Sequence, residues 1–219
     1  MSKTAVILLS GGLDSSTTLY HALAQGYDCR CLVFDYGQKH KKEISAAKAL
    51  ARQAGCPSVC VAIRLPWKAS ALLDKNIPVP QNRVLTGKDI PVTYVPGRNI
   101  IFLSFAASFA EAISAGAIFI GANAVDYSGY PDCRPEFIRA YQAMLGRGLK
   151  AFVQGKIIKV KTPLIHLSKA QIVKLAVKLK VPLHLTWSCY NGGKRPCGVC
   201  DSCRLRAQGF AEAKVKDLA

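Results

Sequence analysis

The sequence has no uninterrupted hydrophobic run long enough to cross a membrane. Only five apolar residues, 5–9, precede Ser10 near the start, which is too few for the hydrophobic region of a signal peptide. The apolar region 100–122 is interrupted by Glu111 and Gly116, so it predicts a buried helix followed by a strand. We therefore expect a cytoplasmic protein with no membrane partner.

Acidic residues are also scarce. The chain has 13 Asp and Glu against 30 Lys and Arg, a formal net charge of +17, and residues 147–219 alone hold 15 basic and 3 acidic side chains. A basic surface attracts nucleic acid or anionic substrates, but a solvated lysine-rich face has the same composition. The charge by itself therefore does not identify a partner.

Internal repeats and low-complexity linkers are absent from the 219 residues, and half of the residues are hydrophobic. This composition excludes a disordered chain and fits one domain of ordinary size with a small appendage. We predict an α/β domain over residues 1–185 and a small module over residues 186–219. Five prolines and the lack of a clear period mark residues 66–96 as an irregular insertion that could cover a substrate.

Strand and helix patterns alternate along the first domain. Short apolar runs predict strands at 5–9, 28–34, 58–63, 117–120 and 156–161, and amphipathic or apolar stretches predict helices ending near 24, 54, 115, 146 and 180. Ser168 and Gln171 form a capping box that opens the last of these helices. The short links between elements predict an α/β fold with a parallel five-stranded sheet and helices on both faces.

The first strand ends in a small-residue turn, Ser10-Gly11-Gly12, and Asp14, Ser15 and Ser16 follow as possible helix N-caps. Glycines let the backbone approach a phosphate, and a helix N-terminus adds partial positive charge. No lysine follows the second glycine, which excludes a Walker A loop. The signature S-G-G-x-D-S instead resembles the PP-loop of the ATP pyrophosphatases. This resemblance implies an ATP-binding set of Leu8, Leu9, Ser10, Gly11, Gly12, Leu13, Asp14, Ser15, Ser16, Thr17 and Thr18.

Three further loops, 35–40, 95–99 and 121–134, leave the carboxyl ends of predicted strands, where open α/β sheets bind ligands. The second of them places a guanidinium and an amide at a helix start, which predicts another anion site. A surface position, an ordinary ion pair or a turn cap is the alternative role for these side chains. With the phosphate-loop aspartate, the candidate catalytic or substrate-binding residues are Asp14, Gln38, His40, Arg98, Asn99, Asp126, Tyr130, Asp132 and Arg134.

Nine cysteines in a reducing compartment indicate metal ligands or free thiols rather than disulfides. The spacing C-x7-C-x2-C-x2-C predicts a closed, structural Zn²⁺ site formed by Cys189, Cys197, Cys200 and Cys203. Zinc would supply folding energy to a segment too small for its own core. An iron–sulfur cluster, which uses similar ligands, is the alternative. Four cysteines in or beside predicted strands are expected to be small core residues: Cys29, Cys31, Cys56 and Cys60.

Taken together, the motifs resemble the 7-cyano-7-deazaguanine synthase family of PP-loop ATPases. They are S-G-G-L-D-S at 10–15, F-D-Y-G-Q-K-H at 34–40, V-P-G-R-N at 95–99, the loop 121–134 and the four-cysteine tail. The resemblance implies an adenine-nucleotide α-hydrolase-like fold, a zinc ion and a homodimer. It also implies ATP-dependent conversion of 7-carboxy-7-deazaguanine and ammonia to the nitrile in queuosine biosynthesis.

This chemistry suggests roles for particular residues. Mg²⁺ is expected because phosphate charge must be neutralised and the loop brings no lysine, and Asp14 would serve as its ligand or as the helix cap. Asp126 or Asp132 is expected to pair with the deazaguanine edge, and Tyr127 or Tyr130 to stack on the ring. No glutaminase domain fits within 219 residues, so free ammonia is the expected nitrogen source.

Two other functions fit parts of the sequence. A PP-loop enzyme that adenylates a base in tRNA would use the basic residues 147–219 as its RNA footprint, although the loop 121–134 fits it poorly. A zinc-ribbon module that binds nucleic acid without consuming ATP is the second. We expect that nucleic acid is not required.

Overall fold

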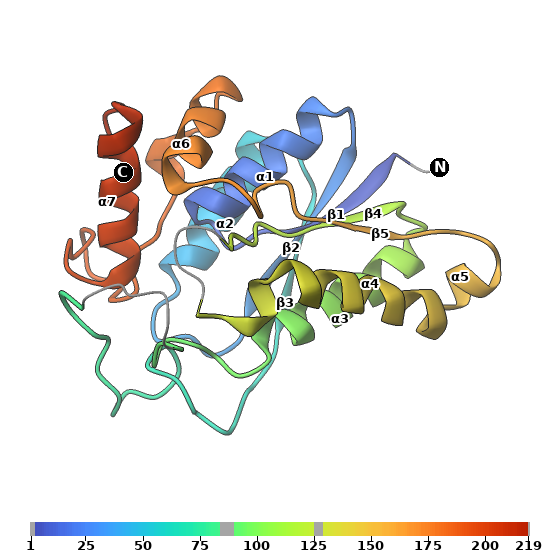
Figure 1. The fold of residues 1–219 in the computed structure, drawn as a ribbon, viewed down its shortest axis with the longest axis horizontal. Helices are drawn as coiled ribbons and strands as arrows, with labels where there is room; N and C mark the ends of the chain where they lie inside the picture. The colour runs from blue at the N-terminus through green and yellow to red at the C-terminus, as the bar shows by residue number, and fades with distance from the viewer. Residues whose placement is uncertain (1–2, 84–89, 125–128, 219) are drawn as a thin grey trace.

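The computed structural model describes residues 3–83, 90–124 and 129–218. Five strands form one parallel sheet in the order β3-β2-β1-β4-β5 (Figure 1). The strands are β1 Thr4–Leu8, β2 Asp28–Asp35, β3 Ser58–Ala62, β4 Ala117–Phe119 and β5 Lys159–Lys161. The predicted α/β class and its five-stranded parallel sheet are confirmed.

Strand β1 occupies the centre of the sheet. It pairs with β2 from Thr4 to Leu8 and with β4 from Ala5 to Ile7. Residues 5–8 are buried because both faces of the strand are covered, which explains a run of apolar residues without alternation. The loop that follows β1 therefore leaves the middle of the carboxyl edge of the sheet.

Helices cover both faces of the sheet (Figure 1). Ile7 packs with Leu19 and Leu50 on the face covered by α1 Leu13–Ala24 and α2 Lys42–Gln53. Val6 packs with Leu103 and Ile138 on the opposite face, covered by α3 Arg98–Ala112 and α4 Pro135–Gly148. The remaining helical segments are α5 Lys150–Val153, α6 Lys169–Lys178, α7 Asp201–Ala213 and the short 3-10 turns η1 Pro131–Cys133 and η2 Leu183–Leu185.

Two local expectations are confirmed and one is wrong. The Ser168–Gln171 capping box opens α6, with both reciprocal hydrogen bonds formed. Cys29 and Cys31 are buried, but Cys60 is exposed because β3 is an edge strand whose residues are mostly in contact with solvent.

Within the described residues, no helix is long and apolar enough to span a membrane.

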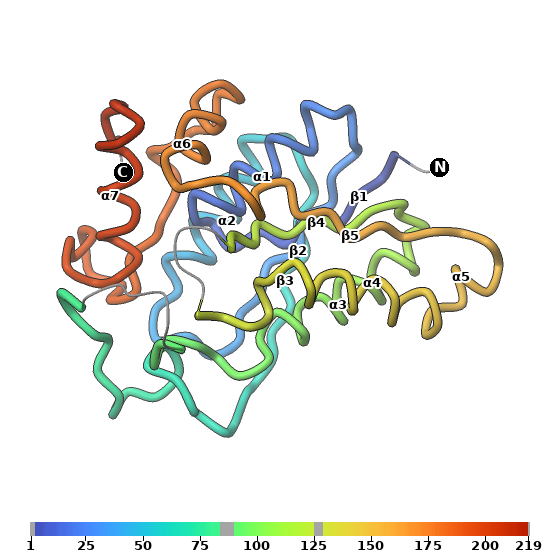
Figure 2. Tube along the Cα trace, viewed as in Figure 1, coloured from blue at the N-terminus to red at the C-terminus, as the bar shows by residue number. Residues whose placement is uncertain are grey.

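The carboxyl-terminal segment packs against one end of the sheet domain. Phe210 of α7 joins Ile172 and Val173 of α6 in one apolar cluster. The described part of the insertion 66–96 runs beneath α7 (Figure 2), where the amide of Asn82 donates to the carbonyl of Val199 over 2.9 Å. The insertion therefore contacts the segment that carries the four cysteines.

Candidate functional site

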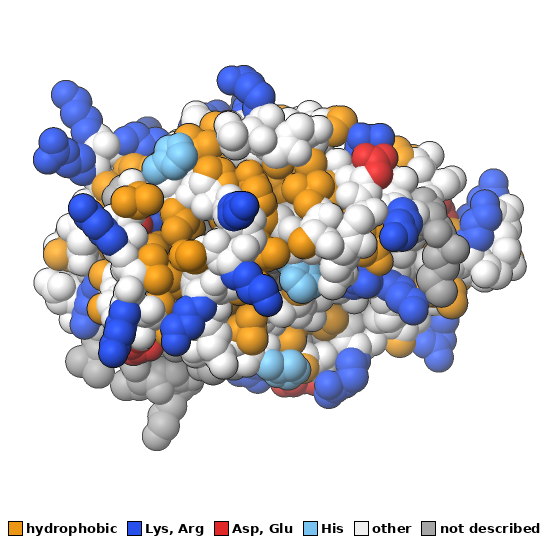
Figure 3. Space-filling view, turned by 90° about the horizontal axis from the view of Figure 1, so that it is seen from above, with side chains coloured by type: hydrophobic (Ala, Val, Ile, Leu, Met, Phe, Trp, Pro, Cys, Tyr) orange, Lys and Arg blue, Asp and Glu red, His pale blue; other side chains and the backbone are white. Residues whose placement is uncertain are grey.

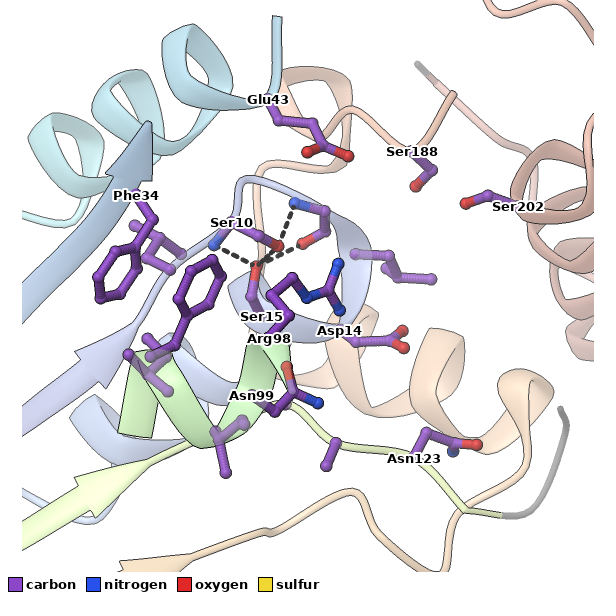
Figure 4. A pocket seen from close by; sticks show the side chains of 18 of the residues that line it. Ser10, Asp14, Ser15, Phe34, Glu43, Arg98, Asn99, Asn123, Ser188 and Ser202 are labelled. Atoms are coloured by element: carbon purple, nitrogen blue, oxygen red, sulfur yellow. Dashed lines mark hydrogen bonds between the residues drawn. The ribbon is translucent and has the colours of Figure 1, made fainter. Parts of the chain in front are cut away.

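A pocket of about 300 Å³ opens at the carboxyl edge of the sheet. Its walls come from the phosphate loop, the end of β2, the starts of α2 and α3, the loop after β4 and the segment 187–206 (Figure 4). Parallel α/β sheets bind ligands at this edge because the strand carboxyl ends and the helix amino ends meet there.

The phosphate loop is held by its own hydroxyl groups. The Ser10 amide and the Ser10 hydroxyl both donate to Ser15 Oγ, over 3.2 and 3.0 Å. The Ser15 hydroxyl in turn lies 3.2 Å from the Gly12 carbonyl oxygen (Figure 4). The N-cap of α1 is Gly12, without a side-chain cap, so the predicted capping role of Asp14, Ser15 and Ser16 is wrong. These three residues lie inside the first turn, where hydroxyls reach back to preceding carbonyls.

Only part of the predicted ATP-binding set lines the pocket. Ser16, Thr17 and Thr18 are buried, and their hydroxyls donate to backbone carbonyls four residues earlier over 2.7–2.9 Å. These three residues and Gly11 do not line the pocket. The members that do are Leu8, Leu9, Ser10, Gly12, Leu13, Asp14 and Ser15.

Gly11 fixes the loop against α2. Its φ is +84°, and an added Cβ would overlap the Glu43 carbonyl oxygen and lie 2.6 Å from the Ala47 nitrogen. The Gly11 carbonyl also accepts a 2.9 Å hydrogen bond from the Trp187 amide. Only glycine fits a position with this φ and such close backbone neighbours.

Asp14 has a partner that the sequence did not suggest. Lys169 Nζ donates to both Asp14 carboxylate oxygens, at 2.7 and 2.9 Å, and both residues line the pocket. The loop itself brings no lysine, but the first turn of α6, 155 residues later, supplies one. The capping box marks the start of α6, where Lys169 lies, and it is the only feature of the sequence that points to this residue.

The start of α3 is bonded to the loop before α4. The Asn99 amide donates to Asp132 Oδ2 over 3.0 Å, and the Asn99 side chain donates to Asp132 Oδ1 over 3.3 Å. Asp132 is buried, and burial raises the pKa of its carboxyl. Both carboxylate oxygens of Asp132 accept hydrogen bonds from Asn99, and Asp132 does not line the pocket. This carboxylate therefore positions α3. Arg98 does line the pocket and hydrogen-bonds the Tyr36 hydroxyl.

The other candidates are spread around the site. Gln38 lines the pocket, but its side chain already forms two hydrogen bonds. Its oxygen accepts from the Tyr36 backbone amide over 2.8 Å, and its nitrogen donates to the Phe34 carbonyl over 3.2 Å. Tyr130 lines it as well and shares a 3.0 Å hydrogen bond with Thr93. His40 lines a separate small cavity, and Arg134 is exposed outside both. Asp126 and Tyr127 lie outside the described residues.

Sequence reasoning missed several pocket residues. Glu43, in the first turn of α2, points into the pocket on the side of Ser188 (Figure 4). Burial raises the pKa of Glu43 to about 7, and the cation of Arg98 partly offsets this effect. The Phe34 and Phe102 rings stack with centroids 4.0 Å apart and form an apolar wall. The start of α2 lies at the carboxyl edge of the sheet. This position was the one feature from which a place for Glu43 in the pocket could have been predicted.

The four predicted zinc ligands come together beside the pocket. One sulfur from each of Cys189, Cys197, Cys200 and Cys203 lies within 4.8 Å of the others. Backbone amides of Asn191 and Cys197 donate to Cys189 Sγ, each over 3.4 Å, which suits a thiolate. Four converging thiols fit a closed tetrahedral zinc site. Ser188 and Tyr190, on either side of the first ligand, line the pocket.

The parallel sheet and the Ser-Gly-Gly loop in the pocket define an adenine-nucleotide α-hydrolase-like protein. NMN synthetase from Francisella tularensis has this fold, with a TM-score of 0.53 and 17% identity over 98% of this chain and 79% of that one. A predicted subunit of tRNA methyltransferase from Methanocaldococcus jannaschii also matches, with a TM-score of 0.51 and 15% identity over 80% and 74%. The chain belongs to the QueC family of queuosine biosynthesis proteins, whose model matches residues 4–214.

Curated relatives agree with this assignment along nearly the whole chain. The 7-cyano-7-deazaguanine synthase of Acetivibrio thermocellus is 55% identical over 98% of this chain and 96% of its own length. The synthases of a Nostoc species and of Thermoplasma volcanium are 53% and 50% identical, over 97% and 99% of this chain and 95% and 90% of their own lengths. The family predicted from the motifs is confirmed.

Replacing Gly11 with Ala should cost more stability than the left-handed backbone alone explains. Gly155, with φ +75° and no atom within 4 Å of an added Cβ, is the matched control. G155A should cost about 1–2 kcal/mol, and G11A about 1–3 kcal/mol more because the new methyl group meets α2. Urea denaturation measures both. Equal losses would show that the loop does not depend on this contact.

Replacing Cys197 with Ser should remove the metal and lower the melting temperature by about 10 °C or more, because metal binding contributes folding energy. The exposed thiol of Cys60 lies outside the cluster, so C60S should keep both metal and stability. Metal analysis and thermal denaturation provide the measurements. A metal-free C197S protein with an unchanged melting temperature would contradict a structural role.

Proposed function

We propose that the pocket converts 7-carboxy-7-deazaguanine and ammonia to 7-cyano-7-deazaguanine through two ATP-dependent activations. A carboxylate does not react with ammonia, because its oxygen is a poor leaving group. Transfer of AMP to that oxygen gives an acyl adenylate, and ammonia displaces AMP to form the amide. A second adenylation, on the amide oxygen, lets that oxygen leave as AMP and gives the nitrile. QueC membership and the phosphate loop lining the pocket support this proposal.

The residues of the pocket divide the work. Loop amides and the hydroxyls of Ser10 and Ser15 bind the departing pyrophosphate and stabilise its developing charge. Lys169, held by Asp14, adds a fixed positive charge beside the loop. The stacked Phe34 and Phe102 rings offer an apolar wall for a flat heterocycle. Asp126 remains the candidate for pairing with its edge and Tyr127 or Tyr130 for stacking on the ring, whereas Asp132 acts only through Asn99 and α3.

Mg²⁺ accompanies ATP in this proposal. The ion would neutralise phosphate charge that Lys169 alone does not balance, and Asp14 is the pocket carboxylate that directly follows the loop in the sequence. The zinc held by the four cysteines is structural, one per chain, because four thiolates leave no open position for a substrate. The catalytic steps then involve the loop, the pocket residues and Mg²⁺, without the zinc.

We also propose a cytoplasmic homodimer. The resemblance implies this assembly, and the apolar side chains of Ile100 and Phe105 on α3 are 46% and 41% exposed. Free ammonia is the nitrogen source in this proposal.

Modification of a base in tRNA is the second candidate, and the structure favours it less. On the face shown in Figure 3, Lys and Arg side chains are spread over the surface, with apolar and uncharged side chains between them. A nucleic-acid footprint requires basic side chains clustered along one face. The pocket, lined by aromatic rings and loop amides, suits a free heterocycle better.

Incubation with ATP, Mg²⁺, ammonium and 7-carboxy-7-deazaguanine tests the proposal. Mass spectrometry should show the amide and then the nitrile, with AMP and pyrophosphate as the nucleotide products. Omission of the acid should stop ATP consumption, and addition of tRNA should not replace it. Absence of both amide and nitrile would contradict the function, and ADP as the nucleotide product would contradict the adenylation steps.

Replacing Asp14 with Asn should reduce turnover about 100-fold or more, because it removes charge that holds Lys169 and any metal at the phosphates. D28N is the control, since Asp28 is an exposed carboxylate paired with Arg30 at the opposite edge of the sheet. Steady-state rates at saturating substrates give the comparison. Near-normal turnover of D14N would remove this carboxylate from the reaction site.

A further inference from the structure

A second, much smaller cavity lies against the wall of the pocket. Its volume is about 10 Å³, the space of a single water-sized molecule. Tyr36, Gln38, Glu43 and Tyr190 line both cavities, so these four residues form the partition between them. His40 lines the small cavity but not the pocket. A molecule bound there would be one side chain away from the nucleotide pocket.

Most polar groups around the small cavity already have partners. The Gln38 amide bonds the backbone of β2 and its loop, and Lys39 Nζ donates to the Ile77 carbonyl over 2.6 Å. The Tyr36 hydroxyl bonds Arg98, and the Tyr190 hydroxyl bonds Tyr130. These groups therefore have little capacity left for a ligand.

Two acceptors remain. His40 Nδ1 is buried and has no hydrogen-bond partner among the described residues, which is costly for a polar atom. The Glu43 carboxylate forms no hydrogen bond or ion pair within the described part of the chain. With its ring proton on Nε2, the unpartnered Nδ1 of His40 carries a lone pair, and His40 lines the cavity. A carboxylate and a lone pair facing a one-molecule space select a small ligand that donates hydrogen bonds.

We propose that this small cavity binds ammonium, and that Glu43 takes the proton that converts ammonium to the nucleophile ammonia. The inference rests on the proposed function, which requires ammonia to form the amide. Ammonium donates four hydrogen bonds and carries a positive charge, so it matches the unpaired carboxylate and the His40 lone pair. Water matches the size of the cavity but carries no positive charge to balance the carboxylate.

The proton balance follows from the same residues. Ammonium gives one proton to the Glu43 carboxylate and becomes ammonia, whose nitrogen attacks the adenylated carbonyl. The new C–N bond forms, the bond to the AMP oxygen breaks, and AMP carries away that electron pair. The extra proton on nitrogen leaves to solvent, which gives the neutral amide. Glu43 faces Arg98, Tyr36 and Tyr190, and it shares the small cavity with Lys39 and His40. Burial raises the pKa of Glu43 to about 7, which allows it to exchange protons near neutral pH.

Glu43→Gln tests the site because it keeps the shape and removes the charge. The control is E136Q, since Glu136 also lies in the first turn of a helix but is exposed on α4. With ATP and the acid saturating, the KM for ammonium should rise about 10- to 100-fold in E43Q, as loss of a charge-assisted bond implies. E136Q should match the unsubstituted enzyme.

Exchange of labelled pyrophosphate into ATP, with the acid present and ammonium absent, isolates the adenylation step. E43Q should keep this exchange within about twofold, which also shows that the variant is folded. An unchanged KM for ammonium in E43Q would overturn the ammonium site, and so would loss of the exchange, which would place Glu43 in adenylation. Absence of exchange in the unsubstituted enzyme would instead overturn the proposed function.

A pair of His40 variants checks the second acceptor. H40Q removes the atom at the Nδ1 position, whereas H40N keeps an amide group there. H40Q should raise the KM for ammonium about tenfold, and H40N should raise it less. Equal values for the two variants would remove Nδ1 from the site.

Discussion

The contact between the phosphate loop and α2 is the constraint on which the rest of the site depends. Gly11 lies so close to the carbonyl of Glu43 and the amide of Ala47 that no side chain fits between them. This approach holds the loop amides at the end of the central strand and turns the first residues of α2 toward the pocket. The position of Glu43 is therefore set by the same contact that shapes the nucleotide site.

A second contact couples the cysteine segment to that loop. Trp187 donates its amide to Gly11, and two residues later Cys189 supplies the first thiol of the four-cysteine cluster. Ser188 and Tyr190, between and beyond them, face the pocket. Metal at the cluster would therefore stiffen one wall of the site without touching a substrate, because the bound segment has little apolar core of its own.

Much of this could be predicted from the sequence because the signals were local. The unbroken apolar run before Ser10 gave the central strand, and Ser168 with Gln171 gave the start of α6. The partner of Asp14 and the tie between Asn99 and Asp132 could not be predicted, because each joins segments that approach only in the folded chain. Cys60 was misjudged because a strand pattern does not reveal whether the strand lies at an edge.

The long reach of these contacts has a consequence for synthesis of the chain. The pocket needs Lys169 against Asp14 and Trp187 against Gly11, and both partners are translated long after the phosphate loop. Domains fold as their residues emerge from the ribosome, so the sheet can begin to assemble while its nucleotide site is still incomplete. The pocket of a nascent chain therefore stays incomplete until residues 169 and 187 have been translated.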